Sequence, residues 1–136
     1  MSGVSDKRAA AIIGLVAGCF MIASGFTHGF GGWPTLKATL EVQQVETPFI
    51  ESLYVGWWFG SFAMAALGSI IIAQSIGALR RGRVSRPTIA IVAVMYLACG
   101  VWAFVVRHMN PFFLLFIATG LLVACLLRLP DEGSPE

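Results

Sequence analysis

The chain has 136 residues, of which 57% are hydrophobic and 12% are charged, and its mean hydropathy is +0.82. Soluble domains carry about 25% charged residues, so this composition excludes a soluble globular protein and predicts one domain, residues 1–136, that has lipid as its solvent. The formal net charge of +2 is too small to indicate nucleic acid as a partner. The three cysteines are far apart in the sequence, which gives no support for a disulfide framework or a CxxC site.

Four apolar stretches are long enough to cross a bilayer, which takes about 20 helical residues for about 30 Å of hydrocarbon. None of them contains Lys, Arg, Asp or Glu. In chain order they cover residues 9–30, 53–79, 88–106 and 112–127. The sequence therefore predicts an all-α integral membrane protein, a four-transmembrane-helix up-down bundle.

The first stretch has a second interpretation. Its sequence LVAGC, ending at Cys19, resembles the lipidation signal of bacterial lipoproteins, and cleavage there would make Cys19 a lipidated N-terminus. The apolar run, however, continues through FMIASGF and exceeds the length of a signal-peptide hydrophobic region. We therefore interpret residues 9–30 as a span.

The long connection over residues 32–52 has an amphipathic pattern. Leu36, Leu40 and Val45 recur at near-helical spacing, and Lys37 and Glu41 form an i,i+4 pair. This pattern predicts a short amphipathic outer-loop helix that lies at the membrane interface and covers the mouth of the bundle. A plain connector is the alternative.

Helix start signals stand before the second and fourth spans. Thr47 with Pro48, and Asn110 with Pro111, each offer an N-cap residue followed by proline at the first helical position. The polar C-terminal sequence LPDEGSPE predicts a frayed end.

Basic residues are distributed unequally between the two sides of the predicted bundle. Seven lie on the side of the termini, against Lys37 and Arg107 on the other. The positive-inside rule then predicts a multi-pass protein of the inner (plasma) membrane of a bacterium, with both termini in the cytoplasm.

Small residues recur at helical spacing in the first two spans. Lipid gives apolar helices no hydrophobic reason to associate, so close packing through small residues takes that role. The predicted helix-packing positions are Gly14, Gly18, Gly25 and Gly29 in the first span, and Gly56, Gly60 and Gly68 in the second. The pattern leaves open whether these seams pack within one chain or between chains. We expect leucine at Gly18 or Gly25 to disrupt packing or oligomerisation, and leucine at Ala11 to disrupt it less.

Polar and aromatic side chains gather at the predicted outer ends of the spans. We expect His28 to lie against the outer end of the second or third span, with Glu51 as its partner. The candidate ligand-binding or polar cluster consists of His28, Glu51, Tyr54, Trp58, Arg107, His108 and Asn110. An aromatic belt and a static Glu51–Arg107 ion pair are simpler interpretations of the same residues.

No cofactor and no metal are predicted. Axial ligation of haem by His28 and His108 is an alternative, because four-helix bundles hold haem between facing imidazoles. A divalent-metal site from these histidines and Glu51 has suitable ligand types without a diagnostic spacing. Every Asp and Glu lies outside the spans, which argues against a small proton-coupled exporter.

The favoured functional hypothesis is a small membrane protein that acts through helix packing, as a homo-oligomer or as a subunit of a larger membrane assembly. The alternative is a binding protein or enzyme for a lipophilic ligand or haem at the outer mouth of the bundle. No catalytic dyad of recognisable spacing is present in the sequence, so enzymatic activity stays undecided at this level.

Overall fold

The computed structural model describes residues 2–133 and confirms the predicted helical membrane bundle. Helix α1 (Ser2–Phe26) continues through the π-helical turn η1 (Thr27–Gly32) into α2 (Trp33–Val42), and α3 (Thr47–Arg81) returns beside them. Helix α4 (Arg86–Val106), the 3₁₀ turn η2 (Pro111–Phe113), α5 (Leu114–Ala124) and the 3₁₀ turn η3 (Cys125–Arg128) follow. Four of the resulting helical segments are long and apolar enough to cross a membrane.

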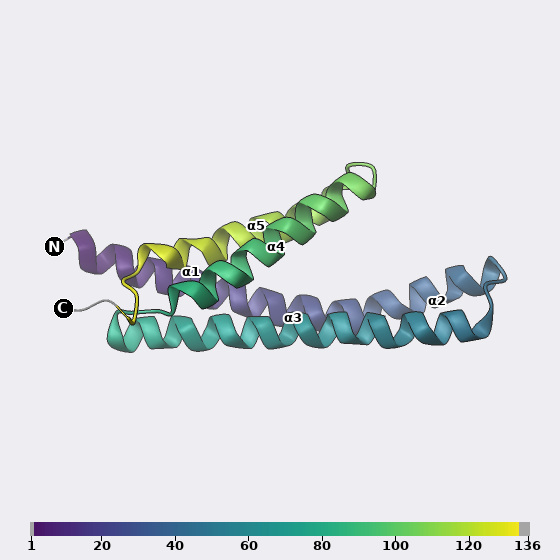
Figure 1. Ribbon diagram of the computed structural model, residues 1–136, viewed down its shortest axis with the longest axis horizontal. Coiled ribbons are helices and arrows are strands. Elements are labelled where there is room, and N and C mark those ends of the chain that lie inside the picture. The colour runs from purple at the N-terminus through teal and green to yellow at the C-terminus, as the bar shows by residue number, and fades with distance from the viewer. Residues whose placement is uncertain (1, 134–136) are drawn as a thin grey trace.

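These elements form two antiparallel hairpins. The first hairpin consists of α1, η1, α2 and α3, and the second of α4, η2, α5 and η3 (Figure 1). Helix α1 also packs against α5 and η3 near the chain termini, and from there the second hairpin diverges from the first (Figure 1). We call the end that holds the termini and the α3–α4 connection the arginine end, and the opposite end the distal end.

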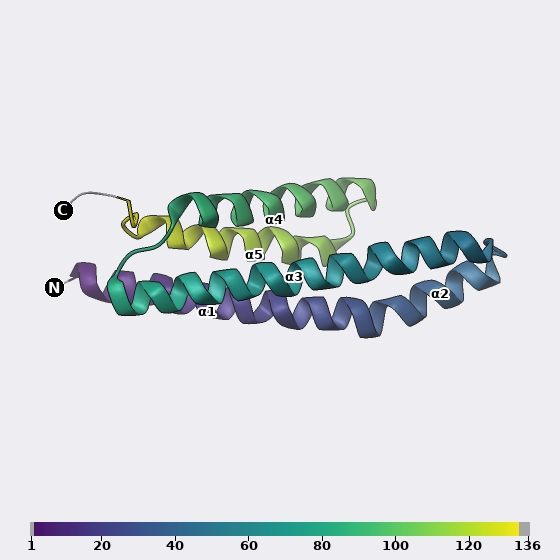
Figure 2. The ribbon, with the colours of Figure 1, turned by 60° about the horizontal axis from the view of Figure 1, so that its bottom comes forward.

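The segment after the first span differs from its prediction. Helix α2 is present, with Lys37 Nζ 3.6 Å from Glu41 Oε1, but it does not cover the mouth of the bundle. The chain stays helical from Ser5 to Val42, so α2 extends α1 along α3, as both views show (Figures 1 and 2). The first helix thus ends at residue 42 and not at residue 30.

The first hairpin is longer than a bilayer requires. Helix α3 has 35 residues, about 52 Å at 1.5 Å per residue, whereas the hydrocarbon is about 30 Å thick. The distal parts of α2 and α3 reach well beyond the turn between α4 and α5 (Figure 2). The predicted cap at Thr47 is shifted by one residue, because Glu46 is the N-cap of α3.

The arginine end is closed by a short pairing of the α3–α4 connection with the C-terminal segment. Gly82 ends α3 with φ 72°, a left-handed conformation that glycine adopts without strain. Beyond it, Val84 N–H donates to Pro130 O, and Glu132 N–H donates to Val84 O, both at 3.0 Å. Arg81 Nη2 lies 2.8 Å from Glu132 Oε1. The prediction of a frayed tail is therefore wrong as far as residue 133, and residues 134–136 lie outside the described part of the chain.

The glycines of α1 pack against α3 of the same chain. A Cβ on Gly18 would lie 2.8 Å from the carbonyl oxygen of Gly68, and a Cβ on Gly25 would lie 2.7 Å from that of Ser61. Gly14 and Gly29 also face side chains of α3. Gly56, by contrast, has open space around it. The seam is thus an intramolecular interface that holds the first hairpin together.

Large apolar side chains cover the outside of the bundle. Val16, Phe62, Ile91 and Leu121, one from each span, are all more than half exposed, as expected for groups in contact with lipid. Ala11, in contrast, is only 1% exposed and belongs to the core. Replacement of Ala11 is therefore also expected to disturb packing, and whether it matters less than replacement of Gly18 or Gly25 stays a prediction.

Candidate ligand-binding cavity

Helix α1 and η1 carry two stripes that face different neighbours. The glycines face α3, whereas Phe20, Ser24, His28 and Gly32, spaced by four residues, line a cavity. Residues four apart share one face of a helix. The same helix therefore closes the first hairpin with one face and forms a cavity wall with the adjacent face.

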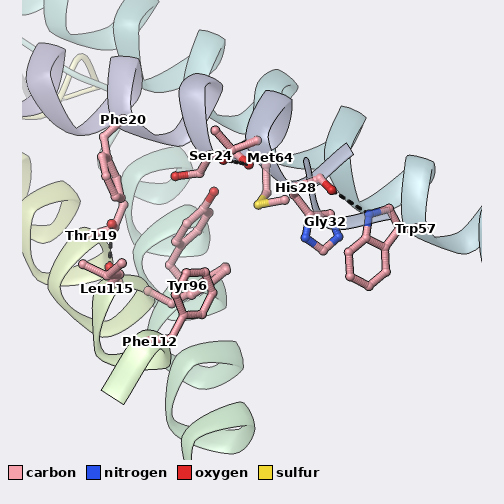
Figure 3. A pocket seen from close by; sticks show the side chains of 12 residues that line it. Phe20, Ser24, His28, Gly32, Trp57, Met64, Tyr96, Phe112, Leu115 and Thr119 are labelled. Atoms are coloured by element: carbon pink, nitrogen blue, oxygen red, sulfur yellow. Dashed lines mark hydrogen bonds between the residues drawn. The ribbon is translucent and has the colours of Figure 1, made fainter. Parts of the chain in front are cut away.

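The cavity lies between the two hairpins and has a volume of about 500 Å³. Met64 and Trp57 of α3 line it together with the α1 stripe, and Tyr96, Phe112 and Thr119 come from the second hairpin (Figure 3). Its wall along α1 and η1 runs from Phe20 to Gly32, about 18 Å of helix at 1.5 Å per residue. The volume of the cavity falls within the range of about 300–1,000 Å³ that is usual for small-molecule sites.

Tyr96 supplies the polar group of this cavity whose hydrogen bonding is incomplete. The residue is 5% exposed, and its hydroxyl is buried without a hydrogen-bond partner among residues 2–133. Figure 3 shows the hydroxyl pointing from α4 toward Ser24 and Met64, which also line the cavity. Thr119, in contrast, donates to Leu115 O at 2.7 Å. A buried hydroxyl without a partner is costly, so Tyr96 is the strongest pointer to a ligand.

His28 lies closer to the distal end and is held by Trp57. The two rings stack with centroids 3.9 Å apart and an interplanar angle of 10°, and Trp57 Nε1–H donates to the carbonyl oxygen of His28 at 2.7 Å. His28 therefore lies against the second span, as expected from the sequence, but its neighbour is Trp57 and not Glu51. The histidine stands in the π-helical turn η1, a local geometry often found at functional sites.

The other predicted cluster residues of the first hairpin lie elsewhere. Glu51 lines a second, smaller and more open cavity of about 350 Å³ with Trp33, Lys37 and Tyr54. Tyr54 packs on Trp33 with ring centroids 4.9 Å apart and on Trp58 at 6.3 Å. Trp33, Tyr54 and Trp58 form an aromatic patch on the distal part of the first hairpin, an arrangement that fits the alternative interpretation of an aromatic belt.

Arg107, His108 and Asn110 lie together in the turn between α4 and η2. As predicted, Asn110 is the N-cap, because its Oδ1 accepts a 3.0 Å hydrogen bond from Phe112 N–H. His108 is exposed, with φ 53°. Within residues 2–133, no hydrogen bond or ion pair joins these three residues to the first hairpin.

The arrangement does not favour the cofactor alternatives. His28 is stacked on Trp57 at the cavity wall, whereas His108 is exposed in the turn of the other hairpin. In the part of the chain that the structure describes, no group of three or more His, Cys, Asp or Glu side chains could hold a metal ion. The cavity beside Tyr96 is therefore a better candidate for a ligand site than a haem or metal site at the histidines.

Sequence reasoning missed most of the cavity lining. The four-residue spacing of Phe20, Ser24, His28 and Gly32 was a readable signal on the first helix. Nothing in the sequence pairs this stripe with Tyr96, because spacing within one helix carries no information about which face of another helix lies opposite.

Comparisons of this chain with protein-family models, with curated proteins and with solved structures find no match.

Proposed function

We propose that this protein binds a lipophilic molecule in the cavity between its two hairpins. The observation that carries the proposal is the buried Tyr96 hydroxyl without a partner, directed toward residues of a largely apolar cavity of about 500 Å³. A cavity that combines apolar walls with a few convergent polar groups is the usual form of a small-molecule site. Phe20 and Phe112 of the lining are 43% and 59% exposed, which supports entry of a molecule dissolved in the bilayer past these two rings.

The glycine seams no longer support assembly between chains as the main function. The α1 glycines that motivated that hypothesis face α3 of the same chain. The exposed apolar side chains of the spans are accounted for by lipid. Ligand binding is therefore the function that the geometry supports best.

The test uses an uncharged long-chain alkyl diazirine as a photoreactive probe, with the protein reconstituted in lipid nanodiscs. We expect saturable labelling of cavity residues, competed by excess unlabelled alkyl analogue. Ser24→Phe should lower this labelling at least about tenfold, because the added ring occupies the cavity. Ala23→Phe is the matched control, since Ala23 is exposed on the lipid side. Labelling that never saturates, or that Ser24→Phe leaves unchanged, would contradict the proposal.

We further propose that the arginine end faces the cytoplasm of a bacterial cell. Seven basic residues lie at this end: Lys7, Arg8, Arg80, Arg81, Arg83, Arg86 and Arg128. Short segments rich in Lys and Arg remain on the cytoplasmic side. Phe112 and Leu115 of the cavity lining lie just after the turn between α4 and η2, toward the distal end, so in this orientation the cavity opens to the outer half of the bilayer.

The orientation predicts that a reporter fused after Glu136 is active in the cytoplasm and inactive in the periplasm. A reporter inserted between Val42 and Thr47, where α2 meets α3, should show the reverse activity. Periplasmic activity of the C-terminal fusion would refute the orientation without affecting the cavity.

A further inference from the structure

We propose that the ligand of the cavity is an uncharged lipid of the quinone class, with a planar ring that bears carbonyl groups. One of the carbonyl oxygens accepts a hydrogen bond from the Tyr96 hydroxyl. This inference rests on the proposed binding function and adds the chemical class of the ligand.

The absence of charged lining residues favours an uncharged ligand. Within the described part of the chain, no Lys, Arg, Asp or Glu side chain lines the cavity. An ionised head group in such an environment would lose its hydration without gaining a counter-ion. Fatty-acid carboxylates and phospholipid head groups are therefore poor occupants.

The aromatic content of the wall favours a ring over a plain alkyl chain. Phe20, Trp57, Tyr96, Phe112 and Phe116 all line the cavity. Tyr96 stacks on Phe116 with centroids 5.9 Å apart and an interplanar angle of 26°, and offset contacts at about 4.5–7 Å are favourable between rings. A planar head group can extend this set of contacts.

Two polar side chains of the cavity, Tyr96 and His28, stand at different levels along its wall. The Tyr96 hydroxyl points toward Ser24 (Figure 3), and His28 lies one turn farther along the same stripe of α1 and η1. A phenol without a partner donates to an acceptor oxygen. Quinones carry carbonyl acceptors on opposite sides of the ring, which suits a site with polar side chains at two depths, whereas a simple long-chain alcohol has one polar end.

Met64 provides the adaptability that such binding needs. The Tyr96 hydroxyl is buried, and it points toward Met64 (Figure 3), which lines the same cavity. Methionine is unbranched and adjusts its shape readily. A change in the Met64 rotamer is therefore the adjustment by which we expect the ligand oxygen to reach the hydroxyl.

The test is competition against the alkyl diazirine probe in nanodiscs. Decylubiquinone should compete at concentrations at least about tenfold lower than hexadecane or palmitate. Tyr96→Phe should weaken competition by decylubiquinone about tenfold, the equivalent of ~1.4 kcal/mol, and leave competition by hexadecane unchanged. Tyr54→Phe is the matched control, because Tyr54 is 45% exposed and lies outside this cavity.

The two proposals fail in different ways. If the probe labels the cavity saturably but hexadecane or palmitate competes as well as decylubiquinone, the assignment of the ligand class is wrong and the binding function stands. The same conclusion follows if Tyr96→Phe changes nothing while its melting curve shows a folded protein. If the wild-type protein shows no saturable labelling, the binding function itself is wrong.

Discussion

Replacing Gly18 by leucine is expected to lower the free energy of unfolding by at least about 3 kcal/mol, at or above the upper end of the usual cost of overpacking a core. The reason is contact between backbones. A Cβ on Gly18 would lie 2.8 Å from Gly68 O and 3.1 Å from Ile72 N, and backbone atoms of a helix cannot move aside as a flexible side chain does. The first hairpin would have to separate along its length.

The measurement is unfolding in mixed micelles, followed by circular dichroism. Gly56→Leu is the matched control, because it makes the same substitution in α3 at a position with open space around it, and we expect a change within about 0.5 kcal/mol. If the free energy of unfolding falls by a similar amount in the two variants, leucine itself causes the loss of stability, and the close approach of α1 to α3 does not.

The span positions followed from the sequence because the bilayer imposes a simple requirement. Each span is a run without Lys, Arg, Asp or Glu, and the backbone inside lipid has to be helical. Local chemistry also predicted the Asn110 cap, since the side chain and the amide that it accepts from are two residues apart. Requirements of this kind act within one segment of the chain, where the sequence is informative.

The continuation of the first helix was not predictable from the same signals. The sequence GFGGWP at residues 29–34 is typical of a break, because glycine and proline interrupt helices. In the structure Pro34 stands at the start of α2, where a missing N–H does no harm, and the π-helical turn η1 precedes it. Packing against α3 outweighs the local preference.

The cavity lies beyond sequence reasoning for a different reason. It depends on how far the second hairpin diverges from the first and on which face of α4 carries Tyr96 toward α1 (Figures 1 and 3). Neither quantity is a property of one helix. The glycine pattern had the same ambiguity, since a small-residue seam looks alike whether its partner belongs to the same chain or to another.

Trp57→Ala should destabilise the protein clearly, because Trp57 holds the His28 side of the cavity wall in two ways. The substitution removes the ring that stacks on His28 at 3.9 Å and the hydrogen bond of 2.7 Å to the His28 carbonyl oxygen. Truncation of a buried aromatic residue costs about 3–5 kcal/mol. Trp57 is partly exposed, so we expect about 2–3 kcal/mol, measured by unfolding in mixed micelles.

Two comparisons separate the contributions of the ring and the hydrogen bond. Trp57→Phe keeps an aromatic ring and loses the donor, so it should cost about 1 kcal/mol. Trp102→Ala is the control for loss of a tryptophan at the lipid surface, because Trp102 is 69% exposed, and its effect should be about 0.5 kcal/mol or less.

The Trp57 hydrogen bond also predicts a local effect on η1. A side chain that bonds to the backbone of a helix is one cause of local departure from α-helical geometry. Without the indole donor, the backbone amides of residues 28–33 should exchange hydrogen faster than in the wild-type protein, whereas those of α5 should not change. Exchange that stays equal at η1 in Trp57→Ala would show that the glycine contacts with α3 hold the turn without Trp57, and His28 would then keep its place at the cavity wall independently of the ring on which it stacks.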